Sequence, residues 1–344
     1  MNKRIVWIDM LRIWATFCVI VAHVQSAFYW DAGIETRGGK EQVIIVGISV
    51  FSVPIFLMLS GKIWLHKKDG VSLKNLWKKI FRLFTALAFW SLFYAILNEI
   101  NNTGFEKNRF IKNILCGNYH LWFMYMFMFI GVYMVIPMLQ QIAKNKTLLI
   151  YTTILAGIFA SLLPTLKNLS IFANSEIFNT IITQIDYKFV LGGGFYFLLG
   201  YLIDDFIINN KRRFALMAVG FAALIISFLL AYYERLSGSH TFNWYGTYMI
   251  NILLYNIGMF AAFKKEYNIS EKLEKSIHII GEYTMGIYLL HDFIKNILNK
   301  MYFALEINFP DVVAVFIISI IVFIVSLLLT LAIKKIPKIG KYIV

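Results

Sequence analysis

The sequence predicts an all-α membrane protein with about ten transmembrane helices. Hydrophobic residues fill 59% of its 344 positions and charged residues only 15%, whereas soluble proteins carry about 25% charged residues. Apolar stretches of about 20 residues, the length that spans a bilayer, recur throughout the sequence. The two cysteines, Cys18 and Cys116, lack the spacing of a disulfide framework or a zinc site, so we expect no metal centre.

Each apolar stretch predicts one membrane-spanning helix. The first is not a cleaved signal peptide, because Asp9 and Arg12 interrupt it and no small-residue cleavage site follows. The largest loop, around residues 164–190, is too short for a separate soluble domain, so a single integral-membrane domain is expected over residues 1–344. The ten stretches are residues 5–30, 43–65, 80–97, 119–139, 148–166, 189–208, 214–233, 247–263, 279–298 and 312–333.

The distribution of basic residues predicts how the protein is oriented. Ten crossings place both termini on one side of the membrane. The loops on that side hold 22 Lys and Arg residues, the opposite loops hold ten, and Arg12 lies inside the first helix. By the positive-inside rule the termini are therefore cytoplasmic in a multi-pass protein of the cell membrane. This bias explains the net charge of +14 without a nucleic-acid partner.

The first helix carries Asp9, Arg12 and His23, and ionisable groups at membrane depth are the first place to look for function. Arg12 and His23 share one helix face and are separated by a rise of about 16 Å. Asp9 lies one turn before Arg12 and can pair with it. Asp9 and Arg12 could instead be an interfacial ion pair that fixes helix depth. His23 could likewise be an interhelical hydrogen-bonding residue rather than a general base.

Three further clusters have two interpretations each. Lys78, Lys79 and Arg82 form either a phosphate clamp or an ordinary positive-inside anchor. The segment 118–123, which contains His120 and Trp122, could bind substrate or belong to an interfacial aromatic belt. In the ninth stretch, Tyr288 and His291 are spaced to face one cavity, and Gly281 and Gly286 are also typical of helix packing.

These residues resemble the acyltransferase-3 family of integral-membrane acyltransferases over nearly the whole chain. The resemblance rests on four segments in order: Arg12 with His23 after ten intervening residues, 54–61, 120–123 and 287–291. The sequence is most similar to the short members that O-acetylate surface polysaccharides. We expect no extracytoplasmic hydrolase-like domain of the kind that some longer members carry, and therefore expect direct transfer to the acceptor or a separate extracytoplasmic partner protein.

The resemblance implies an acyl-CoA donor, acetyl-CoA, on the cytoplasmic side and a hydroxyl acceptor, such as a cell-surface or lipid-linked glycan, on the outer side. His23 would be catalytic, with Arg12 and Asp9 as its partners in the first-helix motif. Where the family often has Arg-x-x-Arg, this chain has Lys79 and Arg82. The positive charge is kept, but one guanidinium group that could bind a phosphate through two hydrogen bonds is lost. The expected donor-phosphate ligands are Arg12, Lys78, Lys79 and Arg82, and the expected acceptor-binding residues are His120, Trp122, Tyr288 and His291.

Two other functions fit the same composition. A transporter or flippase for a glycan or small metabolite would line its path with the same buried charges. In a ligand-sensing or scaffold protein, His23 would only bridge helices. The sequence does not separate direct transfer from an acetyl-histidine intermediate, nor does it identify the acceptor.

Overall fold

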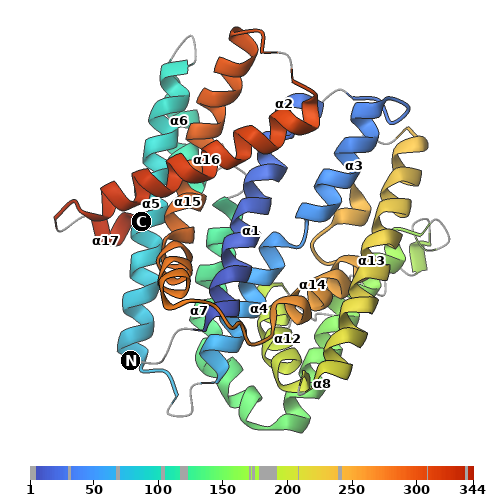
Figure 1. Ribbon diagram of the computed structural model, residues 1–344. Helices are drawn as coiled ribbons and strands as arrows, with labels where there is room; N and C mark the ends of the chain where they lie inside the picture. The colour runs from blue at the N-terminus through green and yellow to red at the C-terminus, as the bar shows by residue number, and fades with distance from the viewer. Residues whose placement is uncertain are drawn as a thin grey trace.

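The computed structural model describes residues 5–29, 32–66, 70–101, 105–116, 123–169, 172, 175–177, 192–207, 209–238, 242–307, 309–337 and 340–344. Regular structure in these ranges is helical throughout (Figure 1). Seven helical segments there are long and apolar enough to cross a membrane. The prediction of an all-α polytopic membrane protein is therefore confirmed. These segments are Val6–Tyr29, Arg37–Leu65, Leu73–Ile100, Lys146–Lys167, Asn210–Leu236, Asn243–Phe263 and Asp311–Lys334.

Each of the ten predicted stretches coincides with helix. The first is α1 (Val6–Val24) followed by α2 (Ser26–Tyr29), and the second is α3 (Arg37–Ser49) followed by α4 (Ser52–Leu65). The others are α5 (Leu73–Asn101), α7 (Phe123–Lys144), α8 (Lys146–Gly157) continued by a π-helical turn (Ile158–Leu162) and α9 (Leu163–Lys167), α12 (Gly193–Phe206), α13 (Asn210–Leu236), α14 (Ile250–Phe263), α15 (Glu271–Ala304) and α16 (Asp311–Lys334). Short elements are α6 (Lys107–Cys116), a 3₁₀ turn (Asn243–Tyr245) and α17 (Gly340–Ile343).

The boundaries differ by six residues or more at the second, third and ninth stretches. The second begins at Arg37 rather than 43, because the Thr36 side chain accepts a hydrogen bond from Gly39 N and caps the helix. The ninth runs over 34 residues, since Ser270 caps its start and acidic residues in the first turn favour the helix N-terminus. Much of the predicted 164–190 loop lies outside the described residues. The number of crossings and the side of the termini stay predictions.

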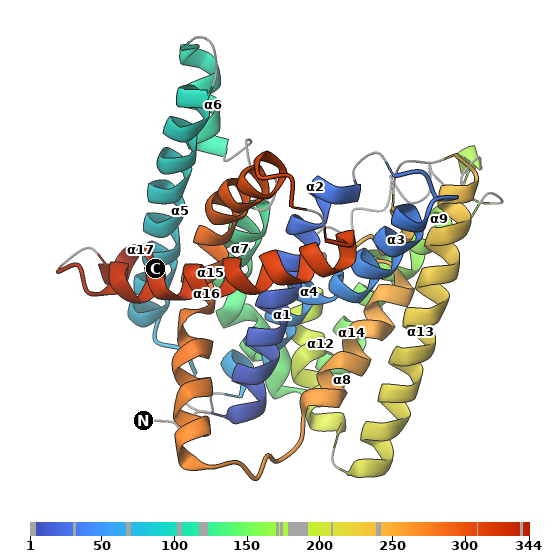
Figure 2. The same cartoon turned by 45° about the horizontal axis from the view of Figure 1, so that its top comes forward.

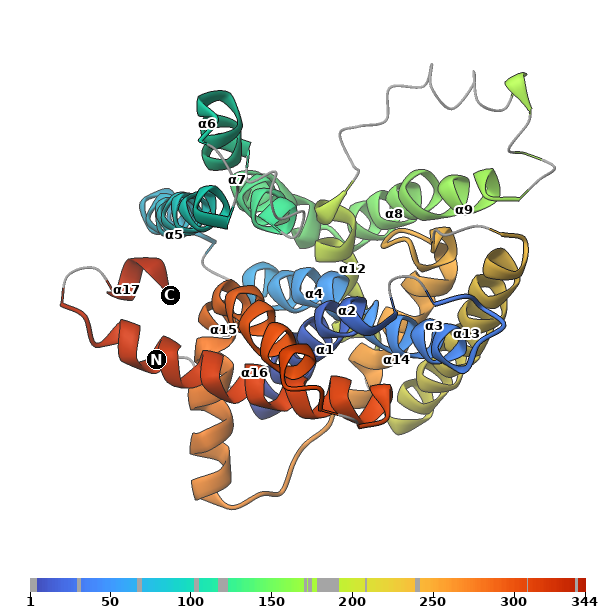
Figure 3. The same cartoon turned by 90° about the horizontal axis from the view of Figure 1, so that it is seen from above.

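Helix α1 occupies the middle of the bundle. It packs against α3, α4, α14, α15 and α16, and Figure 3 shows it between α4 and α16. In Figure 2 the start of α1, the start of α15, the end of α12 and the start of α13 lie toward the lower edge of the molecule, and the α5–α6 hairpin projects from the opposite edge. A face of α1 is therefore available to line an internal site.

Small residues bring the inner helices into backbone contact. A Cβ on Gly61 of α4 would lie 1.8 Å from Phe197 O of α12, and one on Gly200 of α12 would lie 2.1 Å from Met58 O. Close approach through glycine is typical of helix packing in membranes, where the two backbones can gain van der Waals contact. The pair fixes α12 against α4 on the side of α4 away from α15 (Figure 3).

Candidate active site

The predicted catalytic histidine of α1 lies beside a histidine of α15. The rings of His23 and His291 have centroids 5.3 Å apart and planes inclined at 40°. The Tyr288 ring is 5.6 Å from that of His291. His291 is 0% exposed, whereas His23 is partly exposed. The structure thus brings together three residues that were predicted from separate parts of the sequence.

A backbone hydrogen bond assigns the tautomer of a neutral His291 side chain. Its Nδ1 lies 2.5 Å from the carbonyl oxygen of Tyr288. Because a carbonyl oxygen only accepts, the proton belongs on Nδ1. In the neutral ring, Nε2 is then the nitrogen that carries the lone pair, so His291 has a defined acceptor atom.

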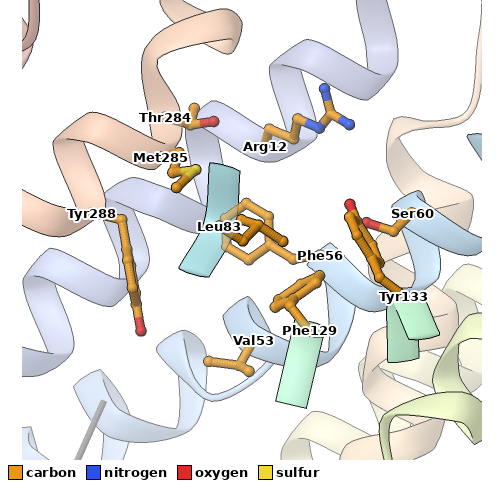
Figure 4. A pocket seen from close by; sticks show the side chains of 10 residues that line it. All are labelled: Arg12, Val53, Phe56, Ser60, Leu83, Phe129, Tyr133, Thr284, Met285 and Tyr288. Atoms are coloured by element: carbon orange, nitrogen blue, oxygen red, sulfur yellow. The ribbon is translucent and has the colours of Figure 1, made fainter. Parts of the chain in front are cut away.

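A cavity of about 230 Å³ lies next to this histidine pair. Figure 4 shows Arg12, Ser60 and Tyr133 on one side of the view and Tyr288 with Val53 on the other. Tyr288 belongs to both the cavity and the histidine cluster, whereas His23 itself is not a lining residue. The lining consists of Arg12, Val53, Phe56, Ser60, Leu83, Phe129, Tyr133, Thr284, Met285 and Tyr288.

The predicted pair of Asp9 and Arg12 forms, and a third residue joins it. Arg12 Nη1 lies 3.4 Å from Asp9 Oδ1, and His278 Nδ1 of α15 donates to Asp9 Oδ2 at 2.7 Å. His278 Nε2 lies 3.4 Å from Glu274 Oε1. Asp9 is 3% exposed, so two donors compensate the burial of its charge. Its carboxylate therefore divides its interactions between Arg12 and His278.

Sequence reasoning missed His278. The residue falls one position before the predicted ninth stretch, so the pattern gave no sign that it lies at the depth of Asp9. The helical spacing of Glu274 and His278 was visible but is common on solvent-exposed helices. His278 comes close to Asp9 because α1 and α15 pack tightly at Gly281. A Cβ on Gly281 would lie only 2.7 Å from Asp9 Cβ.

The structure divides the predicted basic cluster. Lys79 Nζ lies over the Trp64 ring, 4.4 Å from its centroid, and Trp64 contacts the cavity-lining Tyr133 with centroids 5.5 Å apart. Arg82 Nη2 instead donates to Val344 O at 2.8 Å. Lys78 is exposed. Of the three, Lys79 is therefore the one connected to the cavity lining.

His120 and Trp122 lie outside the described residues. A separate ion-pair network links α4, α12 and the end of α14: Asp204 lies 2.6 Å from Lys62 Nζ, 2.9 Å from Lys264 Nζ and 3.4 Å from His66 Nε2. Two ammonium groups already neutralise this 7% exposed carboxylate, so the network holds the ends of α4, α12 and α14 together.

Comparisons with known proteins agree with the resemblance seen in the sequence. The chain is 24% identical over 338 residues to the "Probable poly-beta-1,6-N-acetyl-D-glucosamine export protein" of Staphylococcus aureus strain MRSA252, covering 93% of this chain and 90% of that protein. Proteins of the same name from strains MSSA476 and MW2 are 24% identical over 337 residues, with the same coverage. No solved structure matches the chain. The family described as "Acyltransferase domain" matches residues 5–331, so the chain belongs to the acyltransferase-3 family of integral-membrane acyltransferases.

Proposed function

We propose that this protein transfers an acetyl group from cytoplasmic acetyl-CoA to a hydroxyl of a cell-surface or lipid-linked glycan at the outer side, with His23 as the catalytic residue. The observation that carries the proposal is the pair of His23 and His291 beside a cavity whose far side holds Arg12. Membership of the acyltransferase family supports acyl transfer as the reaction class.

The donor would enter from the side of Arg12. Its phosphates need cations, and Arg12, 28% exposed at its side chain, lines the cavity, while Lys79 reaches its edge through Trp64 and Tyr133. The pantetheine arm is thin and extended, so it can cover the rise of about 16 Å between Arg12 and His23 along α1. Apolar side chains such as Phe56, Leu83 and Phe129 line the cavity and would contact this arm.

In this proposal His23 acts as general base. As the acceptor hydroxyl oxygen bonds to the thioester carbonyl carbon, His23 takes its proton; when the carbon–sulfur bond breaks, the proton passes to the sulfur of CoA. Acetylation of His23 and transfer in a second step gives the same products. Tyr288 and the backbone amides near it are candidates for stabilising the oxyanion.

The names of the relatives support a polysaccharide as acceptor, because a chain of amino sugars offers many hydroxyl groups. They also favour a second candidate function, export of such a polysaccharide. In that case Arg12, Asp9 and His23 would line a permeation path. An exporter leaves its cargo chemically unchanged, whereas an acyltransferase leaves an ester.

Purified protein in liposomes separates these functions. Acetyl-CoA is supplied on the side of the termini and a poly-N-acetylglucosamine oligosaccharide on the other, and O-acetylated product is measured by mass spectrometry. We expect product with the native chain and none above background with His23→Ala. His66→Ala, which removes a histidine of the ion-pair network around Asp204, serves as control. Full turnover by His23→Ala would remove His23 from the chemistry, and outward movement of unmodified oligosaccharide, when it is supplied on the side of the termini instead, would favour export.

A further inference from the structure

Helix α15 changes direction along its length. Figures 2 and 3 both show its first part and its last part running in different directions. Sharp changes of direction in a helix arise at proline, at glycine or serine, at a π-bulge, or where a side chain enters the backbone hydrogen-bond ladder. The second half of α15, which carries His291, contains no proline.

A side chain from α5 enters the ladder beside His291. The Tyr94 hydroxyl donates to Leu289 O at 2.8 Å and accepts from Phe293 N at 3.3 Å. These two backbone groups are four residues apart, so they are the pair that an uninterrupted α-helix joins directly. The Tyr94 hydroxyl therefore bridges Leu289 O and Phe293 N, which would otherwise bond to each other. His291 lies in the helical turn between these two residues.

The surroundings of Tyr94 hold it in this place. It is 3% exposed, and its ring contacts Trp90 and Phe93 of α5, with centroids 6.2 and 5.3 Å away. Trp90 is itself anchored, because its Nε1 donates to Ile343 O at 2.8 Å. Phe93 packs on Phe293 with centroids 5.6 Å apart. The hydroxyl thus reaches α15 from a rigid aromatic support.

We infer that Tyr94 is a positioning residue for the acyl transfer: its hydroxyl opens the turn of α15 at His291 and so turns that imidazole toward His23. The inference rests on the proposed function. Without the hydroxyl, Leu289 O and Phe293 N bond to each other, the helix straightens, and the His291 ring leaves its place 5.3 Å from His23. Donor binding at Arg12 is unaffected, since Arg12 lies on the other side of the cavity.

Turnover of Tyr94→Phe is the first test, with Tyr255→Phe as matched control. Tyr255 is also buried, at 5% exposed, and its hydroxyl also donates to a backbone carbonyl, that of Ile48 at 3.0 Å. We expect kcat of Tyr94→Phe to fall about tenfold with an unchanged KM for acetyl-CoA, and the control to keep its kcat. An unchanged kcat, or melting far below the control, would assign Tyr94 to structure alone and overturn the inference.

A double variant asks whether Tyr94 acts through His291. If it does, Tyr94→Phe combined with His291→Ala turns over no more slowly than His291→Ala alone, because the group being positioned is already absent. Losses that multiply would mean that Tyr94 acts independently, which contradicts the inference.

A distance measurement tests the bend without any reaction. Spin labels at the exposed positions of Lys275→Cys and Lys300→Cys, in a chain with both native cysteines replaced by alanine, report the separation of the ends of α15. The added Tyr94→Phe change is expected to lengthen that separation; an unchanged distance would overturn the inference. Because this measurement needs no substrate, it stands apart from the His23→Ala experiment, in which retained turnover would overturn the proposed function.

Discussion

His23 of α1 and His291 of α15 face each other with ring centroids 5.3 Å apart, and they differ in access. His291 is fully buried, whereas His23 is partly exposed. A hydrogen bond from Nδ1 to the Tyr288 carbonyl fixes the orientation of His291. Under the proposed function the two histidines differ in role: His23 would meet the substrate, and the buried His291 would orient or polarise His23.

The first prediction concerns His291→Asn. The amide of Asn can replace Nδ1 as donor to Tyr288 O, so the fold is preserved, but it provides no counterpart of Nε2. We expect kcat to fall roughly 100-fold, the lower limit for loss of an acid–base partner, while the melting temperature stays near that of the native chain. Steady-state turnover at saturating acetyl-CoA and thermal melting in detergent check this. Native kcat in the variant would reduce His291 to a packing residue.

Arg12→Lys separates donor binding from structure. Lysine keeps the charge beside Asp9 but loses the planar fork that binds a phosphate through two hydrogen bonds. KM for acetyl-CoA is expected to rise about tenfold, the equivalent of one charge-assisted hydrogen bond, with little change in melting temperature. If the variant instead fails to accumulate in the membrane, the ion pair with Asp9 is structural.

His278 provides a third prediction, since it shares the Asp9 carboxylate with Arg12. Removing it in His278→Ala leaves Asp9 to pair with Arg12 alone and thereby withdraws Arg12 from the donor. We expect a raised KM for acetyl-CoA and a lower melting temperature, because a buried carboxylate has lost a donor. In His278→Asn the side-chain amide takes the place of Nδ1 and should restore both quantities. Equal effects of the two substitutions would argue against a role for the hydrogen bond.

Local features of this fold could be predicted from the sequence, whereas long-range contacts could not. The apolar stretches gave the helices because the bilayer sets their length, and Asp9 with Arg12 gave an ion pair because the two are one turn apart. The neighbours of α1 depend on close contacts such as that of Gly281 with Asp9. No periodicity encodes such contacts, and so His278 and Tyr94 were not predicted.

In the basic cluster, residues that are close in sequence have different partners in the structure. Lys79 and Arg82 are three residues apart in sequence and were expected to lie together among the donor-phosphate ligands. In the structure Lys79 lies on the Trp64 ring and Arg82 on the backbone of Val344. Residues three apart on a helix share a face only approximately, and the two sides of α5 meet different partners.

This division predicts that Lys79 and Lys78 differ in function although they are adjacent. Lys79→Ala should raise KM for acetyl-CoA about fivefold, the loss expected for one exposed ionic contact. Lys78→Ala, which removes an exposed charge of the same kind, should leave KM unchanged. The difference should shrink in high salt, because screening weakens exposed charge pairs. Equal effects of the two substitutions would favour a diffuse basic surface over a defined contact.

Gly281→Ala tests the packing that sets the whole site. A methyl group there would lie 2.7 Å from Asp9 Cβ and 2.8 Å from its Oδ1, so α1 and α15 would have to separate. Overpacking of this kind costs about 1–3 kcal/mol, and it should also move Asp9 away from His278.

Gly131→Ala is the control, because nothing lies within 4 Å of its new methyl group and alanine is the better helix former. We expect Gly281→Ala to lower both the melting temperature and kcat and Gly131→Ala to lower neither. If the Gly281 variant keeps native turnover, α1 and α15 can accommodate the methyl group without disturbing the site. The position of the histidine pair would then not depend on close packing at Gly281.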